Sequence, residues 1–194
     1  MKAILISIKP KWCAKILNGE KTIEVRKTMP KCDLPITVYI YCTKDEKYPL
    51  VLDINGCVVL ADKHYCYGDI DLNGKVVAKF ILNKVEEIIC DNDDYGLEIR
   101  TNSMMMYKLL DKSCLSEEEI ARYLPIPEWS FAADGYTKVG YAWYIDNLEI
   151  FDKPKELSEF KPFNNGMPQY KFIKNGCEDI KLTKAPQSWR YIEI

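Results

Sequence analysis

Short runs of β-branched and aromatic residues constrain the fold more than any other feature of this sequence. Such runs are typical of β-strands. Five of them occur, at residues 3–8, 36–42, 75–82, 141–145 and 189–194. Residues 22–26 also alternate between apolar and polar side chains, which predicts another strand. Turn signals at Asn55-Gly56 and Asn73-Gly74 separate the runs. Many strands with few helices predict a strand-rich α+β fold.

Only two segments are predicted to be helical. Pro10 is suited to the first turn of a helix, and apolar residues follow it at helical spacing until Asn18-Gly19, a typical helix end. Ser116 is a good N-cap and precedes three glutamates, which favour a helix start; this helix is expected to end by residue 124, before Pro125.

Length and composition fit one folded domain. The chain has 194 residues, of which 47% are hydrophobic and 29% charged, so a disordered or fibrous chain is excluded. No clear linker interrupts the sequence, and we expect a single domain over residues 1–194. It has no apolar run of the roughly 18 residues that a membrane span needs and no signal-peptide pattern, so we expect a cytoplasmic protein without a membrane partner.

Eight cysteines invite a metal or disulfide interpretation, but their spacing favours neither. No two form a C-x-x-C pair, and His64 is the only histidine. We therefore expect reduced cysteines that act mainly as small apolar residues. No metal site and no cofactor are predicted.

The net charge of −2 hides two segments of opposite charge. Residues 1–32 contain eight lysines and arginines against two glutamates, whereas residues 86–98 contain six acidic residues and no basic one. A local positive surface is what phosphate contacts require. The acidic segment is expected to be a solvated loop.

The basic segment contains a dense polar motif. Lys21 follows the glycine corner at Gly19, and Glu24 and Arg26 lie two residues apart on one face of the predicted strand, roughly 7 Å along its axis. The alternative is that Lys21 and Lys27 are solvated and that Glu24 and Arg26 form a surface ion pair.

Gly19, Lys21, Glu24 and Arg26 fill the pattern G-x-K-x-x-E-x-R, which resembles the signature of the ASCH domain, a member of the PUA-like superfamily. Similarity to small bacterial and phage members of that family covers residues 3–32, 74–88 and 139–192. Residues 89–138 then form an insertion, and residues 155–194 form a C-terminal extension.

The resemblance implies a PUA-like, strand-rich mixed β-barrel with flanking helices and a cleft beside the motif that binds RNA or a modified nucleotide. In this hypothesis Lys21 and Arg26 contact a phosphate or a base carbonyl, and Glu24 accepts hydrogen bonds from an exocyclic amine. The candidate stacking residues are Trp12 beside the motif and Trp129, followed by Trp143 and Trp189, because a base gains roughly 1–3 kcal/mol on an aromatic ring.

Two alternatives remain. Some relatives are amidohydrolases that deacetylate N4-acetylcytidine with a lysine, a threonine and a glutamate; Lys21 matches the lysine, but Glu24 occupies the threonine position, and Thr22 lies on a different face. Lys21 and Glu24 would then be the catalytic residues, with Glu86 and Glu87 as candidates for the third. The other alternative is a non-enzymatic protein-interaction module in which the motif only braces the fold.

Overall fold

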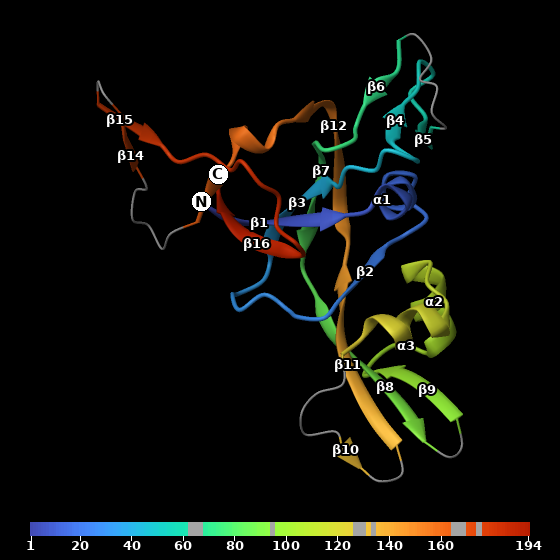
Figure 1. Cartoon of the computed structure of the whole chain (residues 1–194). Helices are drawn as coiled ribbons and strands as arrows, with labels where there is room; N and C mark the ends of the chain where they lie inside the picture. The colour runs from blue at the N-terminus through green and yellow to red at the C-terminus, as the bar shows by residue number, and fades with distance from the viewer. Residues whose placement is uncertain (62–67, 94–95, 126–130, 133–134, 164–169, 174–175) are drawn as a thin grey trace. The chain divides into compact units, whose positions relative to one another are not determined.

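The computed structural model describes residues 1–61, 68–93, 96–125, 131–132, 135–163, 170–173 and 176–194 (Figure 1). These residues form two compact units. The first comprises Met1–Asn18, Ile36–Ile81 and Asn147–Ile194, and the second comprises Gly19–Pro35 and Leu82–Asp146. Residues 89–138 all belong to the second unit. A single domain with an insertion there stays a prediction.

The first unit is built on a six-stranded sheet with β1 (Lys2–Ile8) inside it. On one side β1 pairs in parallel with β3 (Ile36–Cys42), beyond which lie β7 (Val76–Leu82) and β12 (Asp146–Lys155). On the other side it pairs antiparallel with β16 (Trp189–Glu193), which in turn pairs with β13 (Lys161–Pro162). The strands predicted at residues 3–8, 36–42, 75–82 and 189–194 are thus confirmed.

Smaller elements complete the first unit. Helix α1 (Pro10–Leu17) buries Cys13, Ile16 and Leu17, as the spacing predicts, and Gly19 follows with φ of 76°. The other elements are the sheet of β4 (Leu50–Leu52), β5 (Val58–Leu60) and β6 (Ile70–Asp71), the pair β14 (Tyr170–Ile173) and β15 (Gly176–Asp179), and a 3₁₀ turn at Leu157–Glu159.

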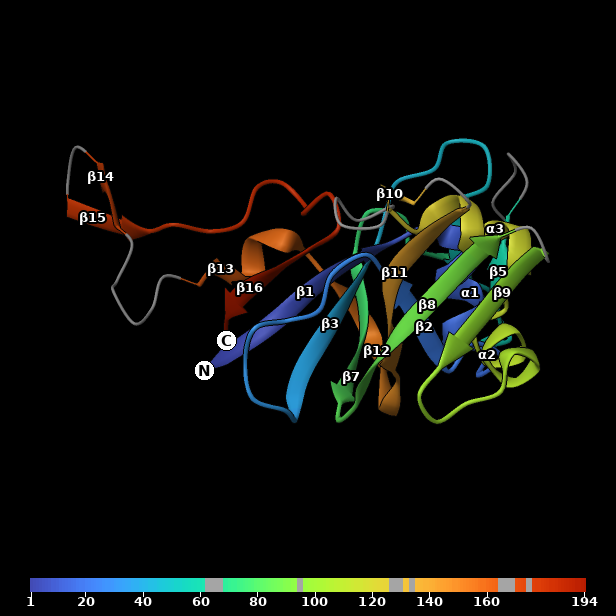
Figure 2. The same ribbon diagram turned by 90° about the horizontal axis from the view of Figure 1, so that it is seen from below.

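The second unit is built on β11 (Gly135–Tyr144). One side of β11 pairs with β8 (Val85–Asp93), which continues to β9 (Gly96–Thr101), and β11 also pairs with β10 (Phe131–Ala132) and β2 (Ile23–Arg26). Figure 2 shows β11, β8 and β9 side by side.

The expectation of a solvated loop at residues 86–98 is wrong, because β8 and β9 pair over this segment. Ile88 and Cys90 point into the core of the unit. The charge of Asp91 is compensated across the sheet, by Arg100 at 2.8 Å and by the hydroxyl of Thr137 at 2.6 Å. A strand can therefore form here, because buried apolar residues alternate with acidic residues that have cross-strand partners. Counting the charges alone does not predict this strand.

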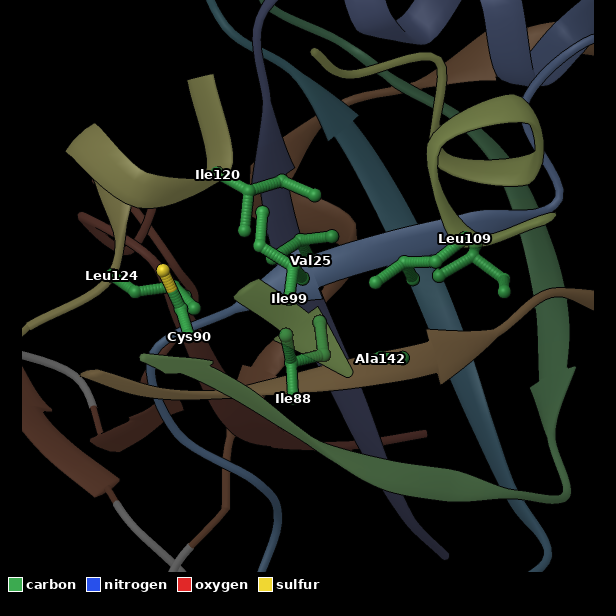
Figure 3. Close-up of a cluster of buried hydrophobic side chains, with 9 residues drawn as sticks. Val25, Ile88, Cys90, Ile99, Leu109, Ile120, Leu124 and Ala142 are labelled. Carbon is green, nitrogen blue, oxygen red and sulfur yellow. The ribbon is translucent and has the colours of Figure 1, made fainter. Parts of the chain in front are cut away.

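Helices α2 (Met106–Ser113) and α3 (Glu117–Tyr123) supply the other half of this core (Figure 3). Leu109 from α2 and Ile120 from α3 pack with apolar residues from β2, β8, β9 and β11, namely Ile23, Val25, Ile88, Cys90, Ile99 and Ala142. Ser116 and Glu119 form a capping box at the start of α3, which confirms the predicted N-cap.

The strand-rich α+β fold is confirmed, but its strands form open sheets. β12 and β13 are the ends of the six-stranded order, and in the described ranges no closed barrel is formed. β13 is only two residues long, so it offers few hydrogen bonds to a further strand.

Candidate nucleotide-binding site

The three polar residues of the motif are carried by one short strand and the residues just before it. In β2, Ile23 and Val25 point into the core of the second unit, so Glu24 and Arg26 lie on the opposite face. That face is buried too. The exposed fractions are 2% for Lys21, 7% for Glu24 and 6% for Arg26.

The buried side chains form one polar network. The Glu24 carboxylate lies between two cations, with Oε2 at 3.3 Å from Nζ of Lys21 and Oε1 at 3.1 Å from a terminal nitrogen of Arg26. Nζ of Lys21 also donates to the backbone carbonyl of Ser113, at 2.7 Å. A single carboxylate therefore fixes the positions of both basic side chains.

The carboxyl end of α2 holds Lys21. Ser113 is the last residue of that helix, and Cys114 follows with a left-handed φ of 53°. Carbonyls in the last helical turn lack partners within the helix and carry partial negative charge, which favours a nearby cation. The carbonyl of Lys112 accepts from the backbone N–H of Thr22, at 2.9 Å, so this helix end is fixed to the motif at two points.

The interpretation of the motif as a surface ion pair is therefore wrong, because the Lys21, Glu24 and Arg26 side chains are all buried. Lys27 alone fits that alternative, since it is exposed. Taking charged groups out of water costs several kcal/mol per ion, and such a cost is offset only by close partners.

Tyr123 extends the network to the surface, although its place at a helix end is the only sequence feature that points to it. Burial raises the pKa of its phenol, the Arg26 guanidinium lowers it, and the Glu24 carboxylate raises it, so Tyr123 interacts with both motif residues. Its side chain is nevertheless 36% exposed, and Nζ of Lys27 lies 5.0 Å from the centre of its ring.

Glu86, a candidate for the third catalytic residue, belongs to another polar group of the second unit. It accepts hydrogen bonds from the hydroxyl of Ser103 and, at 2.8 Å, from that of Tyr144, and it forms an ion pair of 2.6 Å with Lys84. Burial raises the pKa of Glu86, but these donors together outweigh burial and hold it below its ordinary value. Glu87 is exposed.

The predicted stacking residues are not brought to the motif by anything the structure describes. Trp12 is half-buried on α1 of the first unit, with Nζ of Lys11 at 4.3 Å from its ring, whereas the motif belongs to the second unit. Trp129 lies outside the described residues. Trp143 of β11 pairs with Glu24 of β2, but its side chain is fully buried.

The cysteines fit their predicted role in part. Cys13, Cys42 and Cys90 are buried, while Cys57 is exposed. Within the described ranges no group of histidine, cysteine and acidic residues is arranged to hold a metal ion, and no helix is long and apolar enough to cross a membrane. The pair His64 and Cys66 lies outside those ranges.

Comparison with known proteins gives a match at the level of structure. No protein-family model and no curated protein sequence matches the chain. The crystal structure of ASCH from Zymomonas mobilis aligns over 98% of this chain and 87% of that one, with a TM-score of 0.50 and 16% identity. The chain has an ASCH-like fold. Two mutant proteins of the same ASCH align with TM-scores of 0.47 and 0.41, at 16% and 17% identity, over 98% and 81% of this chain and 88% and 77% of theirs.

The ASCH-like α+β fold that the resemblance implies is confirmed, whereas the closed barrel is not found among the described residues. At this identity the match concerns the fold alone, so the roles of Lys21, Glu24 and Arg26 rest on the geometry described above.

Proposed function

We propose that the protein binds RNA or a modified nucleotide at the surface of the second unit where the motif network ends. The supporting observation is the pair of cations that one buried carboxylate, Glu24, holds in place beside the exposed Lys27 and Tyr123. This differs from the initial hypothesis in one respect. Lys21 and Glu24 bind mainly each other and the end of α2, so the ligand meets residues that they position.

Charge favours an anionic ligand. Lys21, Glu24 and Arg26 carry two positive charges and one negative, and Lys27 adds a third positive charge next to them in sequence. Charges in a poorly solvated setting act over distance more strongly than in water, since the effective dielectric constant near a protein surface is about 20. A phosphate group therefore gains from both the exposed lysine and the buried cations behind it.

The geometry favours binding over amide hydrolysis. A lysine that activates a hydroxyl needs that hydroxyl within hydrogen-bonding reach. Nζ of Lys21 instead donates to the Ser113 carbonyl and pairs with Glu24, while Thr22 is exposed and Lys21 is buried. These contacts are typical of a lysine ammonium that holds neighbouring groups in place.

The test is RNA binding measured by fluorescence anisotropy as a function of salt. The variants are Lys27→Gln and, as a matched control, Lys108→Gln, another exposed lysine, on α2 of the same unit. We expect Lys27→Gln to weaken binding and to reduce the slope of log affinity against log salt by about 0.7, the value for one contact to a single-stranded phosphate. We expect the control to match the wild type.

Two outcomes would contradict the proposal. One is a wild-type protein that binds no RNA or nucleotide at low salt. The other is an equal loss in both lysine variants, which would indicate non-specific charge attraction. An assay for release of acetate from N4-acetylcytidine accompanies the binding measurements, and turnover that Lys21→Met abolishes would favour the amidohydrolase instead.

A further inference from the structure

Tyr123 is held in a defined position because α3 packs unusually closely on β11. At Gly140 an added Cβ would lie 2.2 Å from Cδ2 of Leu124 and 3.2 Å from the carbonyl oxygen of Arg26. Only glycine permits this approach. The ammonium of Lys138 donates to the Ala121 carbonyl and so fixes the last turn of α3 to the same strand. Tyr123 lies between these two anchors, directly before Leu124.

The side chain of Tyr123 is partly exposed and has a lysine ammonium near its ring. Nζ of Lys27 lies 5.0 Å from the ring centre, within the range of a cation–π contact. Lys27 is exposed and directly follows Arg26, which interacts with the Tyr123 hydroxyl. The Tyr123 hydroxyl therefore interacts with the buried network, while the exposed Lys27 lies near the ring.

The geometry points to Tyr123 as the residue on which a base of single-stranded RNA stacks, with Lys27 moving from the ring to the adjacent phosphate. This inference rests on the proposed function and adds that the bound group is a base and that Tyr123 is the residue that contacts it. Every base has a planar π-surface, and lysine is compact enough to exchange one contact for the other without loss of its charge.

Two features make Tyr123 better suited to this role than an ordinary surface tyrosine. Its position is fixed by backbone and side-chain contacts before the ligand arrives, so little conformational entropy is lost on binding. The cation that covers it lies beside the phosphate-attracting motif. A base and its phosphate can thus be bound by neighbouring groups.

The experiment measures the affinity of fluorescently labelled oligouridylate and of an abasic ribose-phosphate oligomer of the same length. The variants are Tyr123→Leu, Tyr123→Phe and the matched control Tyr107→Leu. Tyr107 is a 64% exposed tyrosine on α2 with Nζ of Lys108 at 5.9 Å from its ring, so it repeats the tyrosine–lysine contact away from the motif. Thermal denaturation checks that each variant is folded.

We expect Tyr123→Leu to weaken oligouridylate binding by about 5- to 150-fold, the range for loss of one stacked base. Tyr123→Phe and Tyr107→Leu should bind within about twofold of the wild type. The abasic oligomer should bind the wild type and Tyr123→Leu equally.

The outcomes separate this inference from the proposed function. Wild-type binding with no loss in Tyr123→Leu would overturn the stacking role and leave the proposed function in place. Equal losses in Tyr123→Phe and Tyr123→Leu would also overturn it, because the hydroxyl would then be the group that matters. No binding by the wild type would contradict the proposed function itself.

Discussion

Replacing Gly140 by alanine tests the close packing that holds α3 on β11. The new Cβ would lie 2.2 Å from Cδ2 of Leu124, whereas ordinary contacts begin near 3.4 Å, so that methyl must retreat by more than an ångström. Leu124 is 3% exposed and belongs to the core shown in Figure 3, which leaves it little room. The carbonyl of Arg26, at 3.2 Å, resists movement of the strand in the other direction.

The expected cost follows from two opposing effects. Overpacking a close-packed core costs about 1–3 kcal/mol. Alanine restricts the unfolded chain more than glycine does and recovers about 0.4–1 kcal/mol. We therefore expect the free energy of unfolding to fall by about 1–2 kcal/mol, which for a chain of this size lowers Tm by about 2–8 °C.

Urea denaturation of a double-mutant cycle assigns the cost to this contact. Leu124→Ala removes both methyl groups and by itself costs about 2–5 kcal/mol. In that background Gly140→Ala should cost at least about 1 kcal/mol less than in the wild type, because only the contact with the Arg26 carbonyl remains. Equal costs in the two backgrounds, or a Gly140→Ala protein as stable as the wild type, would refute the reasoning.

Three further predictions concern the charged groups and the caps. Glu24→Ala leaves Lys21 and Arg26 without their shared carboxylate, and we expect urea denaturation to show a loss of about 3–5 kcal/mol, against no measurable change for the exposed Glu87→Ala. The pKa of Glu86 is lower in the folded protein than its ordinary value of 4.5, so its ionised form stabilises the fold above that pH and this contribution is lost as the pH falls below it. Urea denaturation should therefore show that Glu86→Gln loses less stability than the wild type between about pH 5 and 3. An unchanged pH profile would contradict this. Ser116→Ala removes the cap of α3 and should cost about 0.5–2 kcal/mol in a thermal melt, whereas Ser116→Asp should retain most of the stability.

The strand at residues 22–26 shows how far local patterns reach. Alternation placed Ile23 and Val25 on one face and Glu24 and Arg26 on the other, and the structure confirms it. The same pattern suggested that the face carrying Glu24 and Arg26 is exposed to solvent. That inference fails because Glu24 and Arg26 are buried, and their network includes Lys21, which binds the end of α2 more than 80 residues later in the chain.

The hairpin of β8 and β9 shows the opposite failure. Six acidic residues suggested a loop, but Ile88 and Cys90 alternate with them and are buried. The number of acidic residues in a segment indicates how well its side chains are solvated when they have no partners. It does not reveal partners such as Arg100 and Thr137, which come close to Asp91 only when the strands pair.

The sequence by itself determined the strand-rich α+β fold, the main strands, both ends of α1, the cap of α3 and the alternation of the strand at residues 22–26. These depend on interactions between residues close in the chain, such as capping, alternation and turn conformation. Only the tertiary structure decided that Lys21, Glu24 and Arg26 are buried and that Tyr123 joins them. Burial and ion pairing depend on which distant segments pack together, and Ser113, Gly140 and Tyr123 reach the motif through such packing.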